Sequence, residues 1–193
     1  MVNFAFPTLA VLALTSAVGA VAVPETSAGA SSEGEVERFS FVKWVDDIIA
    51  NPKGTHLSPE QAYEAWQATV VNATEPAGTL HKRVRCNNIE GGSAPAPDAV
   101  RCINHLAALG TKPCKVTVKS RFATFGNAEI WGVGAGSKTH SSELTFLCSE
   151  HIARAAGKVM DVCWRADNTV QGDEMAWGNG NIDVHIVRKG IIR

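Results

Sequence analysis

Three polar side chains in the second half of the chain are of the types that general acid–base catalysis requires. His185 and Asp183 alternate with apolar residues over 181–187, so both are expected on the outer side of one strand. Glu129, with Trp131 beside it, is expected on a neighbouring strand. A histidine and a carboxylate on one face, with a cation that binds phosphate, can carry out acid–base catalysis. The alternative is that alternation alone places these side chains on the solvent side of a sheet, without a catalytic role.

Motifs that would indicate a cofactor or a metal are absent from the sequence. The chain has no Gly-x-Ser-x-Gly, no phosphate-binding loop of the Walker type and no His-Glu-x-x-His. No two cysteines have the Cys-x-x-Cys spacing that is typical of zinc sites. We therefore expect no cofactor and no metal.

Several basic residues lie within residues 110–134. They form a mild positive strip that consists of Lys112, Lys115, Lys119 and Arg121. Such a strip is suited to contact with an anionic membrane or cell-wall surface. The alternative is one edge of an ordinary soluble surface, and we expect no nucleic acid as a partner.

The residues after Arg83 have the pattern of an α+β domain. Polar and apolar residues alternate in several short stretches, and longer stretches have helical spacing. The expected elements, in chain order, are strand 84–89, helix 98–109 ending at a left-handed Gly110, strands 115–121 and 128–134, helix 143–163, a loop at 167–173 and strand 181–187. This order is the split β-α-β-β-α-β (ferredoxin-like) pattern, a four-stranded antiparallel sheet with both helices on one face.

All five cysteines lie in this domain. In an exported chain they predict disulfides rather than metal ligands. The expected topology brings Cys86 and Cys163 to the same edge of the helical layer, and they are the first predicted pair. Cys102 and Cys148 lie at similar depths in their helices and are the second pair, which leaves Cys114 over. Exchange of Cys114 for Cys86 or Cys102 remains an alternative.

The start of the chain indicates export. An apolar run over 4–14 is followed by small residues, and Ala20-Val21-Ala22 fits the rule for signal-peptidase cleavage after Ala22. The alternative, a membrane anchor, requires a longer uninterrupted apolar stretch. We therefore expect a signal peptide at 1–22 and a secreted, extracellular product.

Residues 23–83 have the composition of a propeptide. A small, polar linker is followed by two helical patterns, one over 37–50 and one that begins at Ser58. The second has a capping pattern, with Ser58 as cap, Pro59 at the first helical position and Gln61 three residues after the cap. Asn72-Ala73-Thr74 is a glycosylation sequon, and Lys82-Arg83 is a candidate site for a kexin-type processing protease. This division predicts cleavage after Arg83 and a mature domain at 84–193.

The charges of the two parts are opposite. Residues 23–83 contain 5 Lys and Arg and 9 Asp and Glu, a net charge of −4, whereas residues 84–193 contain 13 and 10, a net charge of +3. Opposite charges attract, so the propeptide is expected to pack on the mature domain. The alternative is a passive spacer that assists folding.

Several phrases of the chain resemble secreted fungal killer-toxin-like effectors. They are the signal and acidic pro-region, Lys82-Arg83, Arg85-Cys86, Cys102-Ile-Asn-His-Leu, Cys148 within a long helix and Ala176-Trp-Gly-Asn-Gly-Asn-Ile. The resemblance implies secretion and an α/β sandwich more than an activity, and the odd number of cysteines departs from the even number that is usual in such frameworks.

Three functional hypotheses follow from the sequence. The first is an effector or toxin that binds a protein, membrane or wall component on or in other cells, without catalysis. The second is a small hydrolase, ribonuclease-like because His185, Asp183 and Glu129 resemble the acid–base sets of small secreted ribonucleases, that its propeptide keeps inactive. The third is a glycan-binding module of the cell wall.

Overall fold

The structure is a computed structural model that describes residues 38–71, 84–116, 118–134, 144–176 and 182–192. These residues lie in one compact unit, Glu37–Arg193. The described helices are α1 (Phe41–Ala50), α2 (Pro59–Val71), α3 (Ala96–Ala108) and α4 (Cys148–Cys163). The described strands are β1 (Ala94–Pro95), β2 (Pro113–Val116), β3 (Lys119–Phe125), β4 (Ala128–Gly134), β5 (Leu144–Leu147), β6 (Thr169–Val170), β7 (Gly172–Met175) and β8 (Ile182–Arg188).

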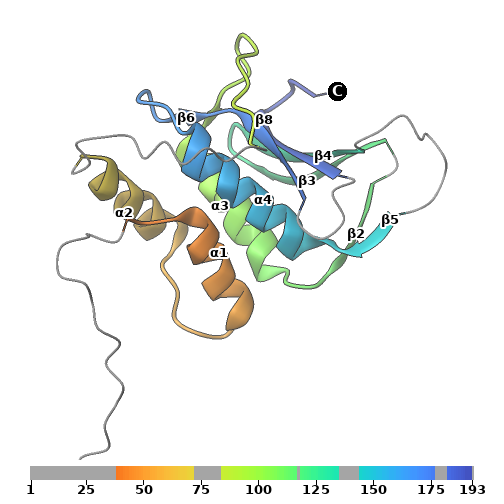
Figure 1. Cartoon of the computed structure of the whole chain (residues 1–193), viewed down its shortest axis with the longest axis horizontal. Helices are drawn as coiled ribbons and strands as arrows, with labels where there is room; N and C mark the ends of the chain where they lie inside the picture. The colour runs from red at the N-terminus through yellow and green to blue at the C-terminus, as the bar shows by residue number, and fades with distance from the viewer. Residues whose placement is uncertain (1–37, 72–83, 117, 135–143, 177–181, 193) are drawn as a thin grey trace, which may run out of the picture. The chain divides into compact units, whose positions relative to one another are not determined.

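A four-stranded antiparallel sheet in the order β3-β4-β8-β7 forms one layer of the fold, against α3 and α4 (Figure 1). Helix α3 contacts β3 and β4, α4 contacts β7 and β8, and the two helices pack against each other. Ile130, Val184 and Ile186 of the sheet and Ile103 and Met160 of the helices are fully buried in the core. The α+β fold with a four-stranded antiparallel sheet is therefore confirmed.

The connectivity of the sheet differs from the expected split pattern. Residues 84–89 do not form a strand of the sheet; only Arg85 pairs with Asp173, through backbone hydrogen bonds of 2.9 and 2.8 Å. The fourth strand is β7, in a stretch that was expected to be a loop. Its sequence Gly-Asp-Glu-Met lacks apolar alternation, and it is a strand because it completes the edge of β8.

Two further boundaries differ from expectation. The predicted strand 115–121 is two strands, β2 and β3, that belong to different sheets. The predicted helix 143–163 begins only at Cys148, because Leu144–Leu147 pairs with β2 as β5. The strands expected at 128–134 and 181–187 are confirmed as β4 and β8, and Gly110 has the left-handed φ of 57° that was expected after the first helix.

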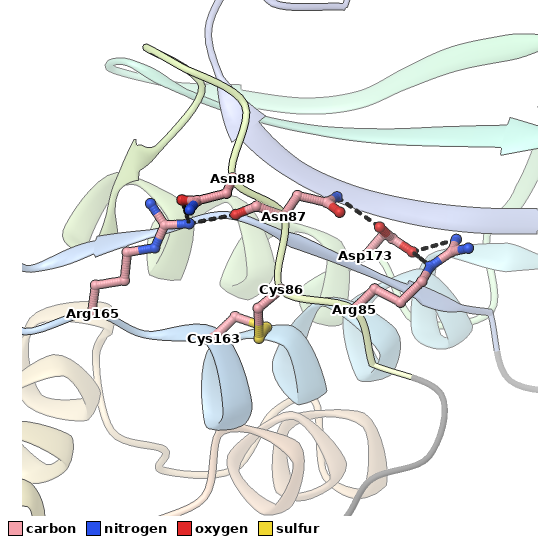
Figure 2. Close-up of a disulfide and its surroundings, with 7 residues drawn as sticks. All are labelled: Arg85, Cys86, Asn87, Asn88, Cys163, Arg165 and Asp173. Carbon is pink, nitrogen blue, oxygen red and sulfur yellow. Dashed lines mark hydrogen bonds and ion pairs between the residues drawn. A yellow bond between two sulfur atoms is a disulfide. The ribbon is translucent and has the colours of Figure 1, made fainter.

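The disulfide between Cys86 and Cys163 is confirmed, with a Cα–Cα distance of 5.3 Å (Figure 2). It joins the segment before β1 to the last residue of α4. The predicted Cys102–Cys148 pair is wrong, because Cys102 is a free and buried thiol. Cys102 lies on the side of α3 that contacts the sheet, where its sulfur is 3.7 Å from the carbonyl oxygen of Ala128.

The two helices before residue 72 pack on the same core. Helix α1 contacts α4 and α3, and α2 contacts α3. The reciprocal cap predicted at the start of α2 is confirmed: the Ser58 amide donates to Gln61 Oε1 at 2.9 Å, and the Gln61 amide donates to Ser58 Oγ at 3.2 Å. Phe41 and Val45 of α1 are fully buried, so residues 41–71, called the helical segment below, cover part of the cysteine-bearing domain.

Candidate functional site

The sheet has a polar face on the side away from α3 and α4. Buried Ile130 and Ile186 are paired on the helix side, so their strand neighbours lie on the other side. Register places five residues in one row across this side: Arg85, Asp173, His185, Trp131 and Arg121. Glu129 and Asp183 flank the row from β4 and β8. We call these seven residues the sheet face.

Glu129 is the most completely bonded residue of the sheet face. Its side chain is 1% exposed. Oε1 accepts a hydrogen bond from Arg121 at 3.0 Å, and Oε2 accepts from Trp131 Nε1 at 2.9 Å and from the Gly190 amide at 3.2 Å. Burial raises the pKa of Glu129, but these hydrogen bonds outweigh burial and hold the pKa below its usual value. Glu129 is therefore a fixed anion.

Two further carboxylates lie at the other end of the row, around Arg85. Asp173 is 2% exposed; its Oδ2 accepts from Arg85 Nε at 2.6 Å and its Oδ1 accepts from Asn87 Nδ2 at 2.7 Å (Figure 2). Asp183 Oδ2 accepts from the same guanidinium at 2.5 Å. The hydrogen bond to Asp173 is the main cause that raises the pKa of Arg85. Arg85 thus pairs with two acids at once.

The sheet face brings together the residues predicted for acid–base catalysis, but Glu129 is already held by three hydrogen bonds. Alternation correctly placed Glu129, Asp183 and His185 on one face. Both carboxylate oxygens of Glu129 and of Asp173 accept hydrogen bonds, however, so neither side chain is free to bind a substrate proton. The His185 ring is half-buried between Trp131 and Asp173 in register, without a hydrogen-bond partner in the described part of the chain. One imidazole among fixed charges is a weaker catalytic set than a free acid and base.

The other residues predicted from sequence are placed separately. Lys119 and Arg121 lie on β3, at the edge of the sheet face, whereas Lys112 precedes β2 in another sheet. Ala22, Asn72, Lys82 and Arg83 lie outside the described residues, as do the side chains of Lys115, Cys114 and Cys148.

A second surface lies where the helical segment meets α4. Trp164, directly after α4, packs against three rings of the helical segment: Phe41, Tyr63 and Trp66, with ring centroids 5.9, 5.3 and 5.7 Å away. Gly157 of α4 is buried, and a Cβ there would lie 3.3 Å from the backbone of Phe41. Ring stacking and close backbone approach make this an interior contact rather than a loose surface one.

Polar groups fix the position of α1 on α4. Asp161 Oδ1 accepts from the Phe41 amide at 2.7 Å, and Oδ2 accepts from Ser40 Oγ at 2.7 Å and from the Val42 amide at 3.3 Å. Arg154 Nε donates to Asp46 at 2.6 Å. A carboxylate at the N-terminus of a helix is favourable because it meets free amides and the positive end of the helix dipole.

Sequence reasoning missed Asp161, Arg154 and Trp164 as interface residues. Asp161 and its α1 partners are separated by about 120 positions, so no local pattern joins them. The one feature of the sequence that predicts this contact is the opposite net charge of residues 23–83 and 84–193. Arg154 also lies 3.6 Å from Glu150 in its own helix, which is the pairing that sequence spacing indicates.

An open groove of about 900 Å³ lies between α1 and α2. Trp44, Leu57 and His56 are among its lining residues. Nowhere in the described ranges do three or more His, Cys, Asp or Glu residues come together as a metal site would require. None of the described helices is long and apolar enough to cross a membrane.

Residues 81–188, more than half of the chain, match the family described as "Domain of unknown function (DUF8794)". No curated protein and no solved structure matches significantly. The matched region contains the disulfide, α3, α4 and the whole sheet, and it excludes the helical segment. The chain therefore belongs to the DUF8794 family.

Proposed function

We propose that this chain is the precursor of a secreted effector or toxin-like protein. The signal peptide at 1–22 is removed, a kexin-type protease cuts after Arg83, and residues 84–193 bind a target protein, membrane or wall component on or in other cells. Asn72 of the propeptide carries a glycan. The resemblance to fungal killer-toxin-like effectors supports the same layout.

The observation that carries the proposal is the way the two parts are held together. The disulfide lies wholly within residues 84–193, and the contacts of the helical segment with α3 and α4 are non-covalent. A cut after Arg83 would therefore release a separately crosslinked domain. The family match begins at residue 81, so it supports the same boundary.

The start of the released domain is anchored on its own side of the cut. Arg85 bonds to Asp173, and Cys86 is in the disulfide (Figure 2). Arg165 donates to the Asn87 carbonyl oxygen and, at 3.1 Å, to Asn88 Oδ1. With these contacts so near the new N-terminus, we expect the sheet to keep its structure after cleavage.

A comparison of cleavable and uncleavable protein tests the proposal. The full chain is secreted from a fungal host as wild type and as Lys82→Ala/Arg83→Ala, and both are labelled and added to candidate target cells. We expect cell binding only from the wild type. Arg188→Ala/Lys189→Ala removes another exposed basic pair and serves as the control that retains binding. Equal binding by the uncleavable protein would contradict the proposal.

The second candidate function is a ribonuclease-like hydrolase. The observation in its favour is that His185 and Glu129 share the sheet face with Arg121 and Trp131. Incubation of cleaved protein with RNA separates the two: turnover that His185→Ala abolishes would favour the hydrolase, whereas RNA left intact by the wild type favours binding.

A further inference from the structure

One stripe of α4 holds most of the contacts with α1. Arg154, Gly157 and Asp161 follow one another at spacings of three and four residues, and Trp164 continues the stripe past the end of the helix. We call these four residues the α4 stripe. Each of them contacts the helical segment, as described above.

The contacts that the α4 stripe makes with α1 are of kinds that other helices can also make. Asp161 accepts from backbone amides and a cap hydroxyl, which are present at the N-terminus of other helices. Gly157 leaves room for a helix backbone. Arg154 requires an acid five positions after the first helical residue, as Asp46 stands to Phe41. Trp164 requires an apolar or aromatic first turn.

One side-chain donor of the helical segment has no partner. Trp66 Nε1 of the helical segment is buried with no hydrogen-bond partner among the described residues. A buried donor without an acceptor destabilises the contact that buries it. The helical segment is held on the stripe by non-covalent contacts, and the proposed cleavage cuts its chain connection to the domain, so another helix can compete for the stripe.

We propose that the α4 stripe is the target-binding surface of the released domain, and that the target presents an amphipathic helix there in place of α1. The N-terminus of the target helix lies against Asp161 of α4. The target helix carries an aromatic or large apolar residue in its first turn, and it has an Asp or Glu that pairs with Arg154. This inference rests on the proposed function. The helical segment is then a built-in competitor that occupies the surface until processing.

The test uses the secreted full chain after cleavage, with a fluorescent synthetic peptide of residues 37–71 as the probe. We expect the peptide to exchange into the cleaved protein. A peptide with Asp46→Lys should bind about 100-fold more weakly, because a like charge then faces Arg154. Arg154→Glu in the protein should reverse the preference and restore binding of the Asp46→Lys peptide. This rescue shows that the variant is folded and that the two residues meet.

The same peptides then compete with target cells. Unlabelled wild-type peptide should block binding of labelled, cleaved protein to cells, and the Asp46→Lys peptide should not. Glu90→Ala, at an exposed acid in a turn of the released domain, should leave both results unchanged. Cell binding that the wild-type peptide does not reduce would overturn the inference and leave the proposed function standing. A secreted product that is never cut at Arg83 would instead overturn the proposed function.

Discussion

Asp161→Ala provides a quantitative test of the contact between the helical segment and α4. The carboxylate accepts three hydrogen bonds at the start of α1, from the Phe41 amide, the Val42 amide and Ser40 Oγ. Loss of a helix cap costs about 0.5–2 kcal/mol, and loss of a partly buried negative charge at a helix N-terminus adds up to about 2 kcal/mol. Together these terms give an expected loss of about 2–3 kcal/mol in the free energy of unfolding.

Urea unfolding of the intact chain, followed by tryptophan fluorescence, measures this loss. With a slope of about 2 kcal/mol per molar urea, the midpoint should fall by about 1–1.5 M. Asp161→Asn keeps the size of the side chain and one acceptor, so it should lose about half as much. Glu90→Ala, at an exposed acid in a turn, should change stability by less than about 0.5 kcal/mol. A loss at Asp161→Ala no larger than that of the Glu90 control would refute the view that Asp161 holds α1.

Three further predictions concern the domain itself. Glu129→Gln should lower the free energy of unfolding by about 2 kcal/mol at neutral pH. The pKa of Glu129 lies below its usual value of 4.5 in the folded protein. The free energy of unfolding of the wild type should therefore be constant above pH 4.5 and fall as the pH drops through the folded pKa. The variant should show a flatter profile of urea midpoint against pH. Burial raises the pKa of Cys102 to about 12; iodoacetamide at about pH 8 should therefore label Cys102 only after unfolding, and labelling of the native protein would contradict its burial. Cys163→Ser should destabilise the protein by about 2–5 kcal/mol, and an unchanged melting temperature would indicate that Cys86 and Cys163 are not joined.

The parts of the fold that could be predicted are those with a local pattern. Strands β4 and β8 were predicted because apolar residues alternate along them, and helix α2 because Ser58, Pro59 and Gln61 form a cap signal. Strand β7 was missed because its buried residues include Asp173 and Glu174, and buried acids give no apolar alternation. Its stability depends on Arg85, which is 88 positions away from Asp173 in the sequence.

The sheet face has a local sequence pattern, whereas the α4 stripe does not. Alternation placed Glu129, Asp183 and His185 on one side of the sheet, because a strand fixes which side each residue takes. It could not show that Arg121, Trp131 and the Gly190 amide bond to Glu129, since those contacts depend on register and on the chain end. The α4 stripe gave only a diffuse signal in net charge, because its partners come from a helix about 100 positions earlier.

We propose above that residues 84–193 form a disulfide-bonded domain that is separable from the helical segment. Mass spectrometry of the unreduced protein collected outside the cell tests it most directly. We predict a product that begins at Val84 and contains a peptide with Cys86 joined to Cys163. A product that begins near Val23 with all five cysteines reduced would contradict the claim.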